Sequence, residues 1–163
     1  MVKSLSIAVA AIAMALAPPV SAQTFSTTAG TYTFSGSGVA VRKGSGGPLN
    51  CAISVDITND GMGNITADNI VFSGHFGFCD AGFVAANVPW TVTVSGSTVI
   101  FHNVYLQTMF PGGDCEGDLV ASFTQTGSIE ELAFDTGFTT PSTIPEVVAA
   151  TGNCSLAGVL SWP

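Results

Sequence analysis

The residues that most often carry out catalysis are few in this chain. His75 and His102 are its two histidines, and either could act as a general base. The most widespread serine hydrolases need Gly-x-Ser-x-Gly, and no serine here has glycine at both positions. Eleven Asp and Glu residues could supply the carboxylate pair of a glycosidase, but their spacing selects no pair. We therefore predict that the protein is not an enzyme, with a small secreted hydrolase of unrecognised site as the enzymatic alternative.

Three carboxylates alternate along one glycine-containing stretch. Asp114, Glu116 and Asp118 could bind Ca²⁺ through oxygen, whereas the simpler interpretation is a solvated acidic loop. Residues 59–64 also resemble part of a calcium loop. They lack the acidic residue at its far end, where Ala67 stands, and ordinary hairpin chemistry accounts for them. We predict no cofactor and no metal beyond this weak calcium candidate.

The first 22 residues have the pattern of a cleavable signal peptide. Lys3 supplies the positive charge, residues 5–17 form an apolar stretch too short to span a membrane, and residues 20–22 are small enough for a signal peptidase. We expect cleavage before Gln23, with an uncleaved N-terminal anchor as the alternative. The mature domain, residues 23–163, is then secreted and carries no transmembrane span.

The mature domain is strongly acidic. The whole chain has a formal net charge of −8, and residues 23–163 contain only Arg42 and Lys43 as cations. Such a domain repels the phosphates of nucleic acids and anionic membrane surfaces, so we predict no nucleic-acid partner. With 47% hydrophobic residues, the chain is too apolar to be disordered.

The four cysteines all lie in the mature domain, and their even number in an exported chain predicts two disulfides. Their spacing is too wide for a redox motif, and no histidine stands at zinc-ligand spacing. Three connectivities are compatible with four cysteines. Sequence order favours Cys51–Cys79 and Cys115–Cys154, each bridge joining residues within one half of the domain.

Apolar and polar residues alternate along most of the mature domain. Ile53, Val55 and Ile57 interleave with polar residues, as β-strands do. We predict an all-β fold: a single antiparallel β-sandwich or jelly-roll-like barrel of about eight strands, stapled by two disulfides. The expected strands are 31–41, 50–58, 64–73, 90–95, 98–107, 118–125, 128–134 and 153–161. Three of these are shorter than the roughly 9–11 residues of an outer-membrane barrel strand, and four cysteines suit a stapled soluble domain better, so such a barrel is a remoter alternative.

One segment does not alternate. Residues 72–83 contain four phenylalanines and three glycines, and Met109 and Phe110 form a second apolar loop tip. These rings either cap the core beneath their loops or form an exposed surface for an oily ligand or another copy of the chain. The candidate apolar binding surface consists of Phe76, Phe78, Phe83, Met109 and Phe110.

The cysteine and tryptophan landmarks form a pattern that resembles the secreted alkane-oxidation activator (PRA-type) proteins of Gram-negative bacteria. The resemblance covers residues 35–160, although residues 129–147 do not align with it. The landmarks are Leu49-Asn50-Cys51, Ile70-Val71-Phe72-Ser73-Gly74 before Cys79, Val88-Pro89-Trp90-Thr91-Val92, Gly113-Asp114-Cys115 and the last strand from Cys154 to Leu160. The resemblance implies an extracellular protein without catalytic residues that is associated with growth on hydrocarbons, emulsification or the biofilm matrix.

Our leading hypothesis is an extracellular protein that promotes the use or emulsification of alkanes through its apolar loops, at the cell surface or in the matrix. The structural alternative is a self-assembling matrix or fibre subunit, in which the strand edge of residues 24–39 pairs with a neighbouring copy or another matrix component. The exposure of Phe76, Phe78 and Phe83 discriminates between a binding surface and a capped core.

Overall fold

The computed structural model describes residues 28–109, 112–135, 142–147 and 152–163. The expected signal peptide, Phe110 and the loop residues 136–141 lie outside these ranges. Within them, the chain forms ten strands, a 3₁₀ turn and one short helix. The strands are β1 (Gly30–Lys43), β2 (Leu49–Asn59), β3 (Ile65–Ser73), β4 (Phe83–Ala86), β5 (Trp90–Ser95), β6 (Thr98–Thr108), β7 (Cys115–Thr126), β8 (Ile129–Phe134), β9 (Thr143–Ile144) and β10 (Cys154–Trp162).

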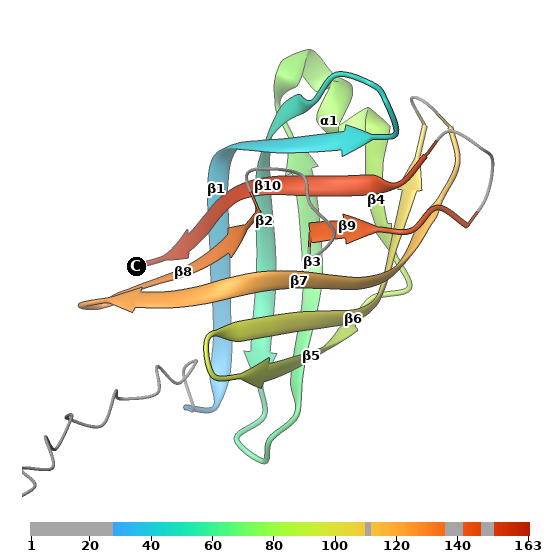
Figure 1. Ribbon diagram of the computed structural model, residues 1–163. Helices are drawn as coiled ribbons and strands as arrows, with labels where there is room; N and C mark the ends of the chain where they lie inside the picture. Colours follow the sequence, from blue (N-terminus) through green and yellow to red (C-terminus); the bar gives the residue numbers. More distant parts are fainter. Residues whose placement is uncertain (1–27, 110–111, 136–141, 148–151) are drawn as a thin grey trace, which may run out of the picture.

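Eight of the strands form a closed antiparallel barrel (Figure 1). Their order is β1-β2-β3-β5-β6-β7-β8-β10, and β10 pairs again with β1. β4 pairs with β6, and β9 pairs with β10. The all-β prediction is confirmed, but the wall closes on itself as a barrel and is not split into the two sheets of a sandwich. Neighbours in the wall follow chain order, so the barrel is of the up-and-down kind and not a jelly roll.

The interior of the barrel is filled by the inward-facing residues of every wall strand. Phe34, Ile57 and Phe123 are among the side chains that are fully buried there. Thr, Ser and Asp occupy most outward positions, as along β2, where Ser54, Asp56 and Thr58 alternate with buried residues. This is the alternation expected of a small barrel whose core consists of its own side chains. β1 and β7 extend beyond their expected bounds, and the register shifts in β1, β3 and β6 interrupt the alternation without ending those strands.

The barrel turns a sharp corner where its first and last strands meet. The register between β1 and β10 shifts between Ser35 and Ala40, and the two backbones come very close there. A Cβ atom added to Gly36 would lie 2.1 Å from the carbonyl oxygen of Val159. On the other strand, Gly158 has a φ of 147° and faces Val39. Closure therefore requires residues without a side chain on both strands.

The pairing of β1 bears on the proposed fibre edge. β1 pairs with β2 from Gly30 to Val41, and with β10 at Ser35 and again from Ala40 to Lys43. Both β2 and β10 therefore pair with β1 within the described part of residues 24–39, which leaves little of this edge for a neighbouring copy. The two helical segments, η1 (His75–Gly77) and α1 (Phe78–Gly82), are short, and no helix in the described ranges has the length and apolarity to cross a membrane.

We expect Gly36→Ala to destabilise the fold by about 1–3 kcal/mol, because the new methyl group must displace the β10 backbone. Thermal unfolding of the disulfide-bonded protein would show this as a lower Tm. Gly47→Ala is the matched control, since nothing lies within 4 Å of a Cβ atom added there. Equal Tm values for the two variants would contradict the closure argument.

Candidate functional site

The connection between β3 and β4 carries the most exposed aromatic side chain among the described residues. Phe76 in η1 is 98% exposed, and Phe78 at the start of α1 is 54% exposed. Met109, after β6, is 61% exposed, and its backbone N–H donates a 3.0 Å hydrogen bond to the carbonyl oxygen of Gly82 at the end of α1. Phe76, Phe78 and Met109 therefore lie at the same end of the barrel. We call these three residues the apolar tip.

The backbone of the tip is strained. His75 and Phe76 have φ angles of 45° and 56°, in the left-handed region that bulky residues rarely adopt. This conformation costs roughly 1–2 kcal/mol per residue relative to the right-handed one. Hydrogen bonds from the N–H groups of Gly77 and Cys79 to the carbonyl oxygen of Gly74 close the turn. Strain held in place by surrounding structure is typical of functional segments.

A disulfide fixes the tip to the barrel wall. Cys79 lies in α1 directly after Phe78 and is bonded to Cys51 in β2, with a Cα–Cα distance of 5.7 Å. Both cysteines are fully buried. The pairing is the one that sequence order favoured, and it anchors the turn that presents Phe76.

The described residues of the candidate apolar surface differ in how far they are exposed. Phe83 is 3% exposed and lies against Phe72, with ring centroids 6.0 Å apart, so it belongs to the core and not to the surface. The reason is its position: Phe83 begins β4 and points inward opposite Thr108 of β6. Phe110 lies outside the described residues. His75 lies beside the tip, with its ring centroid 6.2 Å from that of Phe78.

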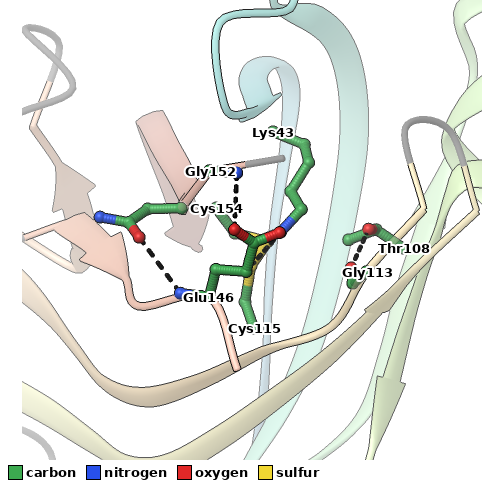
Figure 2. Close-up of polar contacts among 8 residues, drawn as sticks. Lys43, Thr108, Gly113, Cys115, Glu146, Gly152 and Cys154 are labelled. Carbon is green, nitrogen blue, oxygen red and sulfur yellow. Dashed lines mark hydrogen bonds and ion pairs between the residues drawn. A yellow bond between two sulfur atoms is a disulfide. The ribbon is translucent and has the colours of Figure 1, made fainter. Parts of the chain in front are cut away.

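A second cluster holds the last part of the chain across the same barrel end (Figure 2). The disulfide Cys115–Cys154 joins β7 to β10. Residues 143–147 cross beside β7, where the N–H of Glu116 donates to the carbonyl oxygen of Pro145 at 2.9 Å and that of Val147 to Asp114 at 3.0 Å. We call residues 143–147 the strap.

A buried ion pair fastens the strap to β1. Lys43 is 2% exposed, and its Nζ lies 3.0 Å from Oε1 of Glu146 and 3.4 Å from Sγ of Cys115. The other carboxylate oxygen, Oε2, accepts a hydrogen bond from the N–H of Gly152 at 2.7 Å. Figure 2 shows these groups converging around the disulfide sulfur. The pair has partners on every side, which suits a structural clamp.

Sequence reasoning missed this clamp, although its signal is present. From the sequence, Lys43 is considered only as part of the net charge of the domain. It follows Val39 and Val41 at intervals of two, and this alternation places it on the inward face of β1. A charge on the apolar face of a strand needs a buried partner, and Glu146 is the carboxylate that supplies it.

A hydrolase-like arrangement of residue types lies on the outside of the wall. His102 Nε2 is 2.8 Å from the hydroxyl of Thr93, and His102 Nδ1 is 3.0 Å from Oδ2 of Asp118. Asp118 also accepts the N–H of Asn103 at 3.2 Å. A hydroxyl, a histidine and a carboxylate in this order form a catalytic triad when a concave site encloses the substrate. Here Thr93 and Asp118 are exposed on the convex outer face of the barrel. The cluster therefore links three strands, and it does not enclose a substrate.

Two of the three carboxylates of the calcium candidate have different partners. Asp118 bonds His102, whereas Asp114 accepts a 2.6 Å hydrogen bond from the hydroxyl of Tyr105. This bond raises the pKa of Tyr105, because it favours the protonated phenol. Among the described residues, no three His, Cys, Asp or Glu side chains gather closely enough to hold a metal ion.

The opposite end of the barrel contains a buried acid. Glu130 of β8 faces inward beside Trp162 of β10, which packs edge-on against Tyr32. Its Oε2 atom is buried without a hydrogen-bond partner. Burial raises the pKa of the Glu130 carboxyl, because the charged form loses its hydration.

Comparison with known proteins assigns the chain to one family. The family model described as alkane oxidation protein activator PraA/PraB-like matches residues 1–163. Neither a curated protein nor a solved structure matches the chain.

We expect Lys43→Met to lower the free energy of unfolding by about 3–5 kcal/mol, because it leaves the Glu146 carboxylate buried without its cation. Urea unfolding with the disulfides intact measures this loss. The double variant Lys43→Met/Glu146→Gln removes both charges, and it should recover most of the stability. A double variant as unstable as the single one would show that the charge pairing is not what Lys43 contributes.

Glu130→Gln should stabilise the protein at neutral pH by on the order of 1 kcal/mol, because a buried carboxylate whose Oε2 has no hydrogen-bond partner is replaced by a neutral amide. The raised pKa means that the folded state holds the proton more tightly than the unfolded state. The native carboxyl therefore does not destabilise the folded state below the ordinary Glu pKa of 4.5. The loss of stability develops as the pH rises through the raised pKa of the folded state. Urea unfolding at pH 4 and pH 7 should show a gain at pH 7 only. The control is Glu131→Gln at the neighbouring half-buried position, and an equal gain there would argue against burial as the cause.

Proposed function

Because the chain belongs to the PraA/PraB-like family of alkane oxidation protein activators, we propose that it is a non-enzymatic extracellular protein that contacts hydrocarbon through its apolar tip. The observation that carries the proposal is Phe76. An almost fully exposed phenylalanine stands on a left-handed backbone, and the disulfide next to Phe78 clamps that backbone to the wall. An exposed phenylalanine contributes nothing to the free energy of folding. Its transfer from water into an oily phase is favourable.

The energetics of the tip suit reversible adsorption to a hydrocarbon surface. Transfer of a phenylalanine or methionine side chain out of water is worth roughly 1.5–3 kcal/mol. The clamped turn already presents Phe76 and Phe78, and Met109 is hydrogen-bonded beside them, so the three side chains can enter an oil phase without unfolding. The barrel behind them is acidic and polar on its outer face, so it stays in water. A molecule with one oily end and a charged body lowers interfacial tension and keeps coated droplets apart.

Two further features support a place outside the cell. Both disulfides have all four cysteines buried, and the described residues include no free cysteine. Disulfides persist in oxidising compartments and rarely in the cytosol. The signal-peptide pattern of residues 1–22 points to the same route.

We expect Phe76→Ser/Phe78→Ser to abolish most of the interfacial activity and to leave the fold intact. The drop in interfacial tension of purified protein against hexadecane measures the activity, and thermal unfolding checks the fold. Both side chains are exposed, so their loss removes little core packing.

The control is Met62→Ser/Ile129→Ser, which removes two exposed apolar side chains, one from the β2–β3 turn and one from the start of β8, at the opposite end of the barrel. This variant should lower the tension as the native protein does. If both double variants behave like the native protein, or if the native protein is no more active than an unrelated secreted domain, hydrocarbon contact through the tip is wrong.

A further inference from the structure

The barrel wall has a seam between β3 and β4. β3 pairs with β5 only from Ile65 to Ala67, and β4 pairs with β6 from Phe83 to Ala86. In the described chain, no ladder joins residues 68–73 of β3 to β4. η1 and α1 connect these two edges, so the apolar tip lies directly at the head of the seam (Figure 1).

Both edges of the seam bend at an asparagine. Asn69 in β3 has a φ of 47°, and Asn87, between β4 and β5, has a φ of 55°. Both lie in the left-handed region, which asparagine tolerates better than most residues. The bend in β3 is held from β2, because the Asn69 amide donates a 2.9 Å hydrogen bond to Oδ2 of Asp56. The separation of the two strands is therefore built into the backbone.

Apolar side chains fill the space behind the seam. Ile70 and Ala85 are half-buried and pack against the core from the two edges. On the β3 side, Ile70 also lines a cavity of about 30 Å³. Its lining is entirely apolar and includes Ile70, Phe72, Trp90, Phe101 and Leu119.

We propose that the seam admits the end of an alkyl chain, which occupies the apolar cavity beside Trp90. This inference rests on the proposed function, since it names the place where hydrocarbon held at the tip enters the protein. The cavity accepts only apolar groups, because its lining offers no hydrogen-bond partner to water or to a polar headgroup.

The seam is a place where the wall can widen at little cost. Elsewhere along the paired segments, parting two strands breaks ladder hydrogen bonds, and each lost pair leaves buried polar groups unsatisfied. Between residues 68–73 and β4, no ladder has to break. The resting cavity equals about one water molecule's share of liquid volume, so it accommodates a chain end only when Ile70 moves outward.

Bromine quenching of tryptophan fluorescence tests the proposal directly. The chain has two tryptophans: Trp90 lines the cavity, and Trp162 lies at the opposite end of the barrel. In Trp162→Phe, only Trp90 emits, and 1-bromooctane should quench it with a saturable dependence on concentration. Unbrominated octane should reverse the quenching by competition. In Trp90→Phe, where only Trp162 emits, quenching should be absent.

A matched pair of cavity variants sharpens the test, each in the Trp162→Phe background. Leu119→Ala enlarges the cavity, and the half-quenching concentration should fall about fourfold for each methylene group that the extra space admits. Leu132→Ala removes the same atoms from a buried position outside the lining, so its half-quenching concentration should not change. Equal quenching of Trp90 and Trp162, or equal effects of the two leucine variants, overturns the proposal.

The two proposals fail separately. If the tip variants lose interfacial activity but Trp90 is never quenched, hydrocarbon stays on the surface and the seam proposal is wrong. If Trp90 is quenched while Phe76→Ser/Phe78→Ser adsorbs normally, the seam stands and the tip is not the surface that contacts oil.

Discussion

The contact between the first and last strands of the barrel is the constraint on which the rest of the structure depends. β1 and β10 approach so closely that Gly36 and Gly158 leave no room for a side chain at the corner. This closure removes the free edge of an open sheet and defines an inside for the alternating apolar residues. It also places the end of β1 beside the start of β10. Lys43, Glu146 and the Cys115–Cys154 disulfide meet there.

The closed wall lets one end of the molecule depart from ideal geometry. Two disulfides and a buried ion pair hold the chain ends and the strap, so the turn after β3 need not stabilise itself. That turn carries Phe76 in a conformation that costs free energy, and it leaves two edges unpaired below it. Natural proteins place such departures where they act. The rigid wall and the strained tip are therefore two parts of one arrangement.

The parts of this fold that follow from local pattern could be predicted from the sequence, and the parts that depend on distant pairing could not. Alternation along Ile53, Val55 and Ile57 was enough to place strands, and the export signal made disulfides the expectation. Closure pairs strands that are more than one hundred residues apart in the sequence, so no local pattern predicts it. In the glycine-rich segment, the alternation of apolar and polar residues is lost, and only the folded structure distinguishes exposed Phe76 and Phe78 from buried Phe83. Lys43 is the opposite case, because its alternation with Val39 and Val41 is a local pattern from which its inward orientation could have been predicted.

The burial of Lys43, together with its partner Glu146, also affects the charge of the molecule's surface. Residues 23–163 contain two cations, and the clamp withdraws one of them from the surface. Arg42 is the remaining cation against a predominantly acidic exterior. If the protein coats an oil droplet as proposed, the shell of that droplet carries almost only negative charge. The repulsion between two such shells then acts over about one Debye length, about 10 Å in 0.1 M salt. Ionic strength, and not the protein's conformation, would then decide whether such droplets remain dispersed or flocculate.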